Sequence, residues 1–219
     1  MAGRFSISIP KKDLESLKYS GEFHLFDLFI TEGKEEEVYG AWFEKMNLKT
    51  TVKPLAGYSS WYNRYQDISQ KTIIEDLEGC RRILQKGDLF QIDDGWEVAV
   101  GEWEQDKEKF PSSMKEIVDE IHKSGYLSGL WLAPFVVEEK SRIFKEHKDW
   151  LLEIDGEKFK CGCNWSGFWA LDIDNVEVQE YLKRVFKTVY EDWGFDLVKL
   201  DFLYAAAPKA KSNEPRSQR

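Results

Sequence analysis

A lysine and an aspartate interrupt an otherwise apolar segment, Val198 to Phe202, near the end of the chain. Strands that helices cover in a parallel sheet normally read as nearly continuous apolar runs. Side chains alternate along a strand, so Lys199 and Asp201 share one face and the apolar residues take the other. A cation and a carboxylate therefore meet at the carboxyl end of the strand, where parallel α/β folds carry out their chemistry. An antiparallel strand with one solvated face would produce the same short pattern.

Carboxylates, aromatic rings and polar groups also follow three other predicted strands. The carboxyl ends of parallel strands meet at one edge, so we expect these side chains to converge with Lys199 and Asp201. Aromatic faces pack against the apolar C–H patches of a pyranose, while carboxylates and ammonium groups hydrogen-bond to its hydroxyls. The mixture favours a sugar site. Its members are Ser60, Trp61 and Tyr62 after the first strand, Gln91, Asp93, Asp94 and Trp96 after the second, and Trp131 in the third.

Each of these residues has a second interpretation. A tryptophan such as Trp61, Trp96 or Trp131, taken alone, is more often part of the core than of a binding site. Asp93 and Asp94 could cap the next loop through Asx turns or hold Mg²⁺. A lysine beside the fourth strand's aspartate would repel a metal ion, so we expect a sugar site with no metal and no cofactor.

A repeated unit of strand, loop and amphipathic helix carries these side chains from about residue 56 onward. Such alternation argues for a parallel sheet with right-handed crossovers. An open doubly wound sheet also fits, but no glycine-rich phosphate-binding sequence follows the first strand, so we favour a barrel. The pattern predicts strands over 56–61, 88–93, 127–133 and 198–202, helices over 69–86, 112–124, 141–148 and 175–193, and a hairpin over 151–159.

The domain organisation follows from these elements. A closed (β/α)8 barrel needs eight strands, so residues 56–208 are predicted to form the first half of one, about four β/α units. Residues 1–55 read as the trailing end of an N-terminal β-rich domain and a linker, with strands over 22–30 and 52–55 and a helix over 35–46. Residues 209–219 are polar and predicted to be disordered.

Composition limits the classes of partner. With 219 residues, 42% of them hydrophobic and 15% aromatic, the chain can bury a sizeable core. A formal net charge of −9 opposes binding to nucleic acid or to an anionic membrane. No segment approaches the roughly 18 uninterrupted apolar residues of a membrane span, and the N-terminus lacks a signal-peptide core. We therefore expect a cytoplasmic protein.

The cysteines and histidines support neither a disulfide framework nor a metal site. Cys80, Cys161 and Cys163 are odd in number, and no second pair of cysteines or histidines stands at zinc spacing. The histidines lie in segments that read as solvated, so a histidine-based nucleophile relay has no support either.

Six segments occur in unbroken order over about residues 30–208. They are GYSSWYNRY (57–65), FQIDDGWE (90–97), GLWLAPF (129–135), EHKDWLLE (146–153), ALDIDNVEVQEYL (170–182) and DLVKLDFLYAAA (196–207). Together they resemble the consecutive barrel motifs of glycoside hydrolase family 36, the bacterial α-galactosidases. This ordered set is highly specific, whereas DDG or KLD alone would be a weak signal.

The resemblance implies a retaining α-galactosidase that acts on terminal α-galactosyl residues of melibiose- or raffinose-type oligosaccharides. Asp201 in its Lys-x-Asp motif would be the nucleophile, and Lys199 would contact the sugar. Asp93 and Asp94 would hold the galactose hydroxyls at positions 4 and 6, and Trp131 matches the family's tryptophan on strand three. Retaining hydrolysis needs an ionised nucleophile, and we expect the neighbouring lysine to lower the pKa of Asp201.

The resemblance also implies parts that we do not find in the sequence. The family's acid/base aspartate lies on a later strand, and its N-terminal β-sandwich would be represented here only by a tail. We therefore expect a truncated fragment that lacks the acid/base, and that self-associates through the unfinished barrel. Two alternatives stay open: an α-N-acetylgalactosaminidase or raffinose-type galactosyltransferase of the same family, and an inactive remnant or sugar-binding fragment.

Overall fold

The computed structural model describes residues 28–48 and 54–208. These two parts belong to separate compact units, and each is described by itself. The predicted tail over 209–219, and most of the predicted N-terminal β-rich segment, lie outside the described residues.

The first unit contains one helix, α1 (Glu35–Lys45), within its described residues 28–48. Three glutamates in the first turn favour the helix, because negative charge is stabilised near a helix N-terminus. The sequence predicted this helix over 35–46. The strand predicted over 22–30 is wrong in its described part, because residues 28–30 pair with no strand and Leu28 and Ile30 stay exposed.

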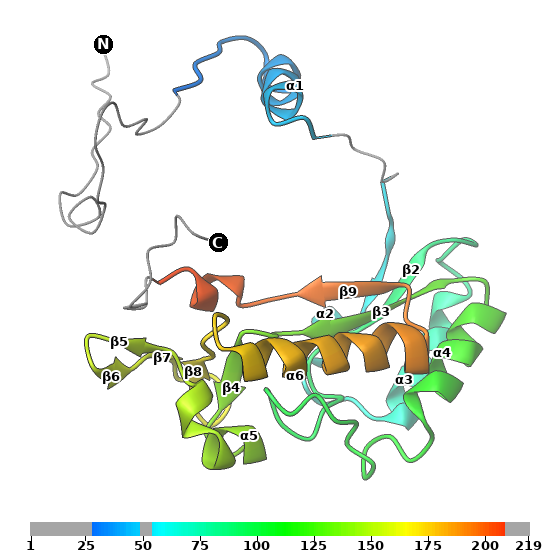
Figure 1. Ribbon diagram of the computed structural model, residues 1–219. Helices are drawn as coiled ribbons and strands as arrows, with labels where there is room; N and C mark the ends of the chain where they lie inside the picture. The colour runs from blue at the N-terminus through cyan, green and yellow to red at the C-terminus, as the bar shows by residue number, and fades with distance from the viewer. Residues whose placement is uncertain (1–27, 49–53, 209–219) are drawn as a thin grey trace. The chain divides into compact units, whose positions relative to one another are not determined.

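The second unit is built on a parallel sheet with the strand order β1-β2-β3-β9 (Figure 1). Its strands are β1 (Gly57–Ser59), β2 (Leu89–Ile92), β3 (Leu127–Leu132) and β9 (Leu197–Leu200). The register aligns Ser59 with Gln91, Gln91 with Gly129, and Trp131 with Lys199. All the strands therefore end at one edge, and the parallel α/β fold predicted from the sequence is confirmed.

Helices follow the strands of this sheet. They are α2 (Trp61–Arg64), α3 (Gln70–Cys80), α4 (Met114–Lys123) and α6 (Val176–Lys187), and α6 continues as a π-helical segment over Thr188–Trp193. The side chains of Ser69, Ser113 and Asn175 accept backbone N–H groups at the starts of α3, α4 and α6. The apolar residues of α4 recur at helical spacing and are all buried, which fixes the helix against the sheet.

The helix predicted over 69–86 is wrong in its last third, because α3 ends at Cys80. The N–H groups of Ile83 and Leu84 both bond to the carbonyl of Cys80, which turns the chain. Ile83 is 80% exposed. The apolar spacing therefore continues in the sequence after the buried face has ended in the structure.

The segment between β3 and α6 holds a second sheet that the sequence analysis did not predict. It is antiparallel, in the order β4-β8-β7. The elements here are β4 (Val136–Glu138), α5 (Arg142–Glu146), a 3-10 turn (Lys148–Trp150), the hairpin β5 (Glu153–Ile154) and β6 (Glu157–Lys158), β7 (Lys160–Gly162) and β8 (Phe168–Ala170). The hairpin predicted over 151–159 is present, and it turns at Asp155 and Gly156. The helix predicted over 141–148 is shorter, because the chain leaves it for the 3-10 turn.

One core joins the parallel sheet, its helices and the inserted sheet. Its largest fully buried side chains include Phe90, Trp96, Phe110, Trp131 and Phe168. A short 3-10 turn, Leu203–Ala206, follows β9. Within the described ranges, none of the helices has both the length and the apolar character needed to cross a lipid bilayer.

Candidate functional site

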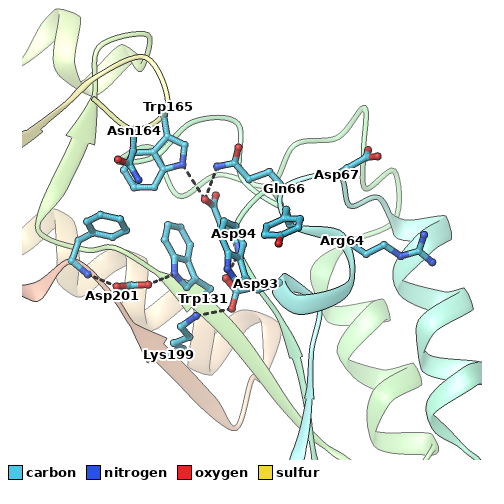
Figure 2. A pocket seen from close by; sticks show the side chains of 13 residues that line it. Arg64, Gln66, Asp67, Asp93, Asp94, Trp131, Asn164, Trp165, Lys199 and Asp201 are labelled. Carbon is cyan, nitrogen blue, oxygen red and sulfur yellow. Dashed lines mark hydrogen bonds and ion pairs between the residues drawn. The ribbon is translucent and has the colours of Figure 1, made fainter. Parts of the chain in front are cut away.

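A cavity of about 660 Å³ lies at the carboxyl ends of β2, β3 and β9 (Figure 2). Six of the ten residues expected at the sugar site line it. The other four, Ser60, Tyr62, Gln91 and Trp96, do not, and Tyr62 in α2 is 88% exposed. The cavity-lining residues are Trp61, Arg64, Tyr65, Gln66, Asp67, Asp93, Asp94, Trp131, Asn164, Trp165, Lys199, Asp201 and Phe202.

Asp93 is buried and held by donors from three strands. Its Oδ2 accepts from Gln91 Nε2 at 2.7 Å, from Lys199 Nζ at 2.9 Å and from Ser59 Oγ at 3.2 Å. Its Oδ1 accepts the N–H of Asp94 at 3.0 Å. Gly129 leaves room for the Gln91 side chain, because a Cβ there would lie 3.2 Å from Cγ of Gln91, a tight contact. The position of Asp93 is therefore set by the sheet itself.

Lys199 forms its ion pair with Asp93, across the sheet. The sequence analysis expected Lys199 to act on Asp201, two residues along the same strand. Among the described residues, no ion pair joins Lys199 to Asp201. The reason is the register: β2 and β9 both flank β3, so the long lysine side chain reaches the aspartate that follows β2.

Asp94 is also buried, but its contacts come from loops. Its Oδ2 accepts from Gln66 Nε2 at 2.6 Å and from Trp165 Nε1 at 2.9 Å. Figure 2 shows both donors converging on this carboxylate from opposite sides of the cavity. Its Oδ1 is buried and receives no hydrogen bond from an N–H or hydroxyl group of the described residues.

Asp201 lies just beyond β9 and is only half-buried. Its Oδ2 accepts from Trp131 Nε1 at 3.2 Å, and its Oδ1 accepts the N–H of Phe202 at 2.8 Å. Two N–H donors fix the orientation of this carboxylate, and the cavity gives access to it (Figure 2). An accessible, oriented carboxylate is what attack on an anomeric carbon requires.

Trp131 combines the two interpretations that the sequence left open. Its ring is fully buried in the core, and its carbonyl accepts the indole N–H of Trp96 at 3.0 Å. Its own N–H nevertheless donates to Asp201 at the cavity. Trp131 is therefore both a core residue and the group that orients Asp201.

Phe202 differs from expectation. The strand pattern put it on the face opposite Lys199 and Asp201, yet it lines the same cavity. Its φ of 53° ends the extended conformation one residue after Asp201, so the alternation of faces stops there. The ring packs against Trp165 and Phe168, with centroids 5.1 and 5.2 Å away.

Sequence reasoning did not identify Gln66, Asn164 or Trp165 as site residues. Trp165 belongs to the loop between β7 and β8, far in the sequence from the strand ends, and its ring lies 6.2 Å from Trp131. A loop rich in tryptophan over 163–169 was the only signal. Gln66 gave none, because a lone glutamine after a short helix has no distinguishing pattern.

In the part of the chain that the structure describes, no three His, Cys, Asp or Glu side chains are grouped to hold an ion. The charge partner of Asp93 is the ammonium group of Lys199, at 2.9 Å from Oδ2.

Comparison with known proteins identifies one family. The profile of the melibiase family matches residues 34–217. The α-galactosidase Mel36A of Lactobacillus acidophilus is 23% identical over 181 residues, which are 80% of this chain and 24% of that protein. Several other α-galactosidases, including that of Escherichia coli at 27% identity over 119 residues, match a shorter part.

Solved structures agree. The α-galactosidase TtGalA of Thermus thermophilus, in complex with p-nitrophenyl α-D-galactopyranoside, superposes with a TM-score of 0.71 at 36% identity over 81% of this chain. A second structure of TtGalA holds stachyose, with a TM-score of 0.70. The AgaA enzyme of Geobacillus stearothermophilus, at 21% identity and a TM-score of 0.60, shares the fold. This chain spans 37% of the first structure and about a quarter of Mel36A.

Proposed function

The chain belongs to the melibiase family, and from that membership together with the cavity we propose a site that binds and cleaves terminal α-galactosyl residues. The observation that carries the proposal is the half-buried, doubly oriented Asp201 in one cavity with two buried aspartates. Relatives that are named α-galactosidases, and TtGalA bound to an α-galactoside and to stachyose, support this substrate class.

Asp201 is the proposed nucleophile. Its carboxylate attacks the anomeric carbon, the glycosidic bond breaks with its electron pair going to the leaving oxygen, and water then hydrolyses the glycosyl-enzyme. Two inversions at that carbon give retention of configuration. Trp131 holds the carboxylate in line, because its N–H donates to the oxygen that does not face the backbone of Phe202.

Asp93, Asp94 and Lys199 are proposed to bind sugar hydroxyls. Carboxylate oxygens accept hydrogen bonds from hydroxyl groups, and the Lys199 ammonium has donors left after its contact with Asp93. Burial strengthens such bonds, since little water competes for them. Trp61 supplies an aromatic face at the rim, where its ring packs edge-on against Tyr65.

The second carboxyl group of the reaction is not one of these aspartates. A retaining enzyme needs an acid/base about 5 to 5.5 Å from the nucleophile, and this group must release a proton to the leaving oxygen. Asp93 and Asp94 instead accept hydrogen bonds from lysine, amide and indole donors. We therefore propose that the described cavity residues, without an acid/base among them, can cleave only substrates whose leaving group departs without a proton.

The same observation favours a second candidate function, sugar binding without turnover. Calorimetry with galactose, combined with hydrolysis of p-nitrophenyl α-galactopyranoside, separates the two. Slow hydrolysis with α-galactose as the first product supports the enzyme, and binding without release of p-nitrophenol supports the binding module. Glucose is the matched control, because it differs from galactose only at the 4-hydroxyl. Equal affinity for both sugars would contradict the proposed roles of Asp93 and Asp94.

We also propose that the parallel sheet is the first half of a (β/α)8 barrel, preceded by the tail of a β-sandwich domain. The strand order leaves β1 and β9 at its edges, and Leu200 on β9 is 44% exposed. Unpaired edges and exposed apolar side chains promote association. Size-exclusion chromatography should show self-association of the chain, and a compact monomer with cooperative unfolding would contradict the half-barrel.

A further inference from the structure

Glu97 is a buried carboxyl group for which the proposed reaction has no use. It lies three residues after Asp94, and only 7% of its surface is exposed. The intervening loop is tightly built: Gly95 has a φ of 112°, and a Cβ at that position would lie 2.6 Å from the carbonyl oxygen of Gln66. Trp96 anchors the loop to β3 through its indole N–H. The loop therefore fixes Glu97 beside Asp94.

The hydrogen bonds of the two carboxyl groups leave one unexplained acceptor. Oδ2 of Asp94 takes N–H groups from Gln66 and Trp165, while its buried Oδ1 receives none from any described amide, indole, ammonium or hydroxyl group. The side chain of Glu97 lies close enough to Asp94 for the two carboxyl groups to interact, and this interaction raises the pKa of Glu97. Two carboxyl groups can share a hydrogen bond only when one of them carries a proton.

We propose that Glu97 is protonated at neutral pH and donates this proton to Oδ1 of Asp94, and so positions this carboxylate for its ligand. Oε2 of Glu97 accepts the N–H of Gly95 at 3.2 Å, which leaves Oε1 to carry the proton. Glu97 is thus a positioning residue that acts through Asp94. Its relevance to sugar binding rests on the proposed function, but the proton itself does not.

The surroundings of Glu97 favour the neutral form. Burial raises the pKa of the Glu97 carboxyl well above its ordinary value, and the charge and hydrogen bond of Asp94 raise it further. The backbone amides of Gly95 and Glu97 act in the opposite direction, and burial outweighs them.

Other charged groups near this loop already have partners. Asp93 pairs with Lys199. Lys109 points its Nζ at the carbonyl oxygens of Gly95, at 3.0 Å, and Gln66, at 3.5 Å. The elements that pack on the far side of Asp94 contribute only neutral donors, from Gln66 and Trp165. Among the described residues, Asp94 is the ionisable group whose charge raises the pKa of Glu97.

A titration followed by NMR tests the proposal without any sugar. The carboxyl carbon of ¹³C-labelled Glu97 should show the shift of a protonated acid at neutral pH. At alkaline pH Glu97 should lose this proton. The indole N–H signal of Trp165, which bonds to Asp94, should then shift in the same transition as the Glu97 carboxyl signal. Glu97→Gln keeps a donor toward Asp94 but cannot ionise, so the Trp165 signal should keep its position and lose this transition.

Two further variants sharpen the result. Asp94→Asn removes the negative charge, so the Glu97 transition should move to lower pH. Glu104→Gln, an exposed change in the neighbouring loop, should leave the transition in place. A carboxylate signal for Glu97 at neutral pH, or an unchanged Trp165 titration in Glu97→Gln, would overturn the proposal.

Galactose affinity separates this inference from the proposed function. In the wild-type chain, galactose affinity should fall over the pH range in which Glu97 loses its proton. Glu97→Ala should weaken the affinity by roughly 10-fold or more at neutral pH, as expected for a lost hydrogen bond to a charged group. Glu97→Gln should bind like the wild type. If the titration is present and galactose fails to bind at any pH, the proton on Glu97 is supported and the proposed function is contradicted.

Discussion

Aspartates lie at both ends of the parallel sheet, in very different arrangements. At the amino end of β3 and β9, Ser128, His122 and Asp196 lie within 2.8 to 3.1 Å of one another. At the carboxyl end, Asp201 faces a cavity of about 660 Å³. The first group has the residue types of a nucleophile relay, and the second has the accessible cavity that the proposed active site requires.

The difference lies in what each aspartate is bound to. Asp196 accepts the backbone N–H and the hydroxyl of Ser128 and contacts Nε2 of His122, so the strand starts are tied together. A relay needs the two ring nitrogens of histidine in different roles, whereas here Nε2 faces both partners. Residue types alone therefore do not define an active site. An active site also needs an accessible reactive group and space for a substrate.

The largest effect is expected for Asp201→Ala. Turnover of an activated aryl α-galactoside should fall by about 10⁴-fold or more, because no glycosyl-enzyme can form without this carboxylate. Azide can occupy the vacated space, so it should restore turnover and give β-galactosyl azide. Asp196→Ala is the matched control at the other end of the sheet. A comparable loss in that variant would break the distinction between the two ends.

A smaller loss is expected for Asp94→Asn. Galactose affinity should fall by about 10- to 100-fold, the usual consequence of losing hydrogen bonds to a charged group. The covalent machinery stays in place, so azide should not rescue this variant. Calorimetry measures the affinity. Rescue of this variant by azide would show that Asp201 is not the nucleophile.

At the amino end, we expect a change in stability and none in sugar binding. Asp196→Ala leaves the buried N–H of Ser128 without its acceptor, which costs about 1 to 2 kcal/mol in the free energy of unfolding. Urea denaturation measures this cost. Loss of galactose binding in a variant that remains folded would show that the network at this end also serves the site.

The smallest effect is a pH dependence of stability. Burial alone would raise the pKa of Asp196, but the Ser128 amide and the His122 ring hold it below the ordinary value. The stabilisation is therefore present above the pKa of an unfolded aspartate and is lost as pH falls through the folded value. Partial exposure limits it to about 0.5 kcal/mol. Asp196→Ala should remove this part of the acid dependence in urea titrations at pH 6 and pH 3.

Much of the fold was predictable because local pattern and burial agree. In α4 the apolar spacing matches the buried face, and at Asp155 and Gly156 the turn residues specify the hairpin. The inserted sheet was not predictable, since its strands have only three residues each and show no alternation.

For the site, strand ends were predictable and loop contributions were not. Asp93, Asp94, Trp131, Lys199 and Asp201 follow from the rule that parallel strands end at one edge. The pairing of Lys199 with Asp93 depends on strand order, which no local pattern contains.

Trapping of the nucleophile tests the central claim most directly. With 5-fluoro-α-D-galactosyl fluoride, whose leaving group needs little protonation, we expect one 5-fluorogalactosyl adduct per chain by intact-protein mass spectrometry. Peptide mapping should assign it to Asp201, and Asp196→Ala should still form it while Asp201→Ala should not. An adduct on another carboxylate, or no adduct in a chain that binds galactose, would contradict the account.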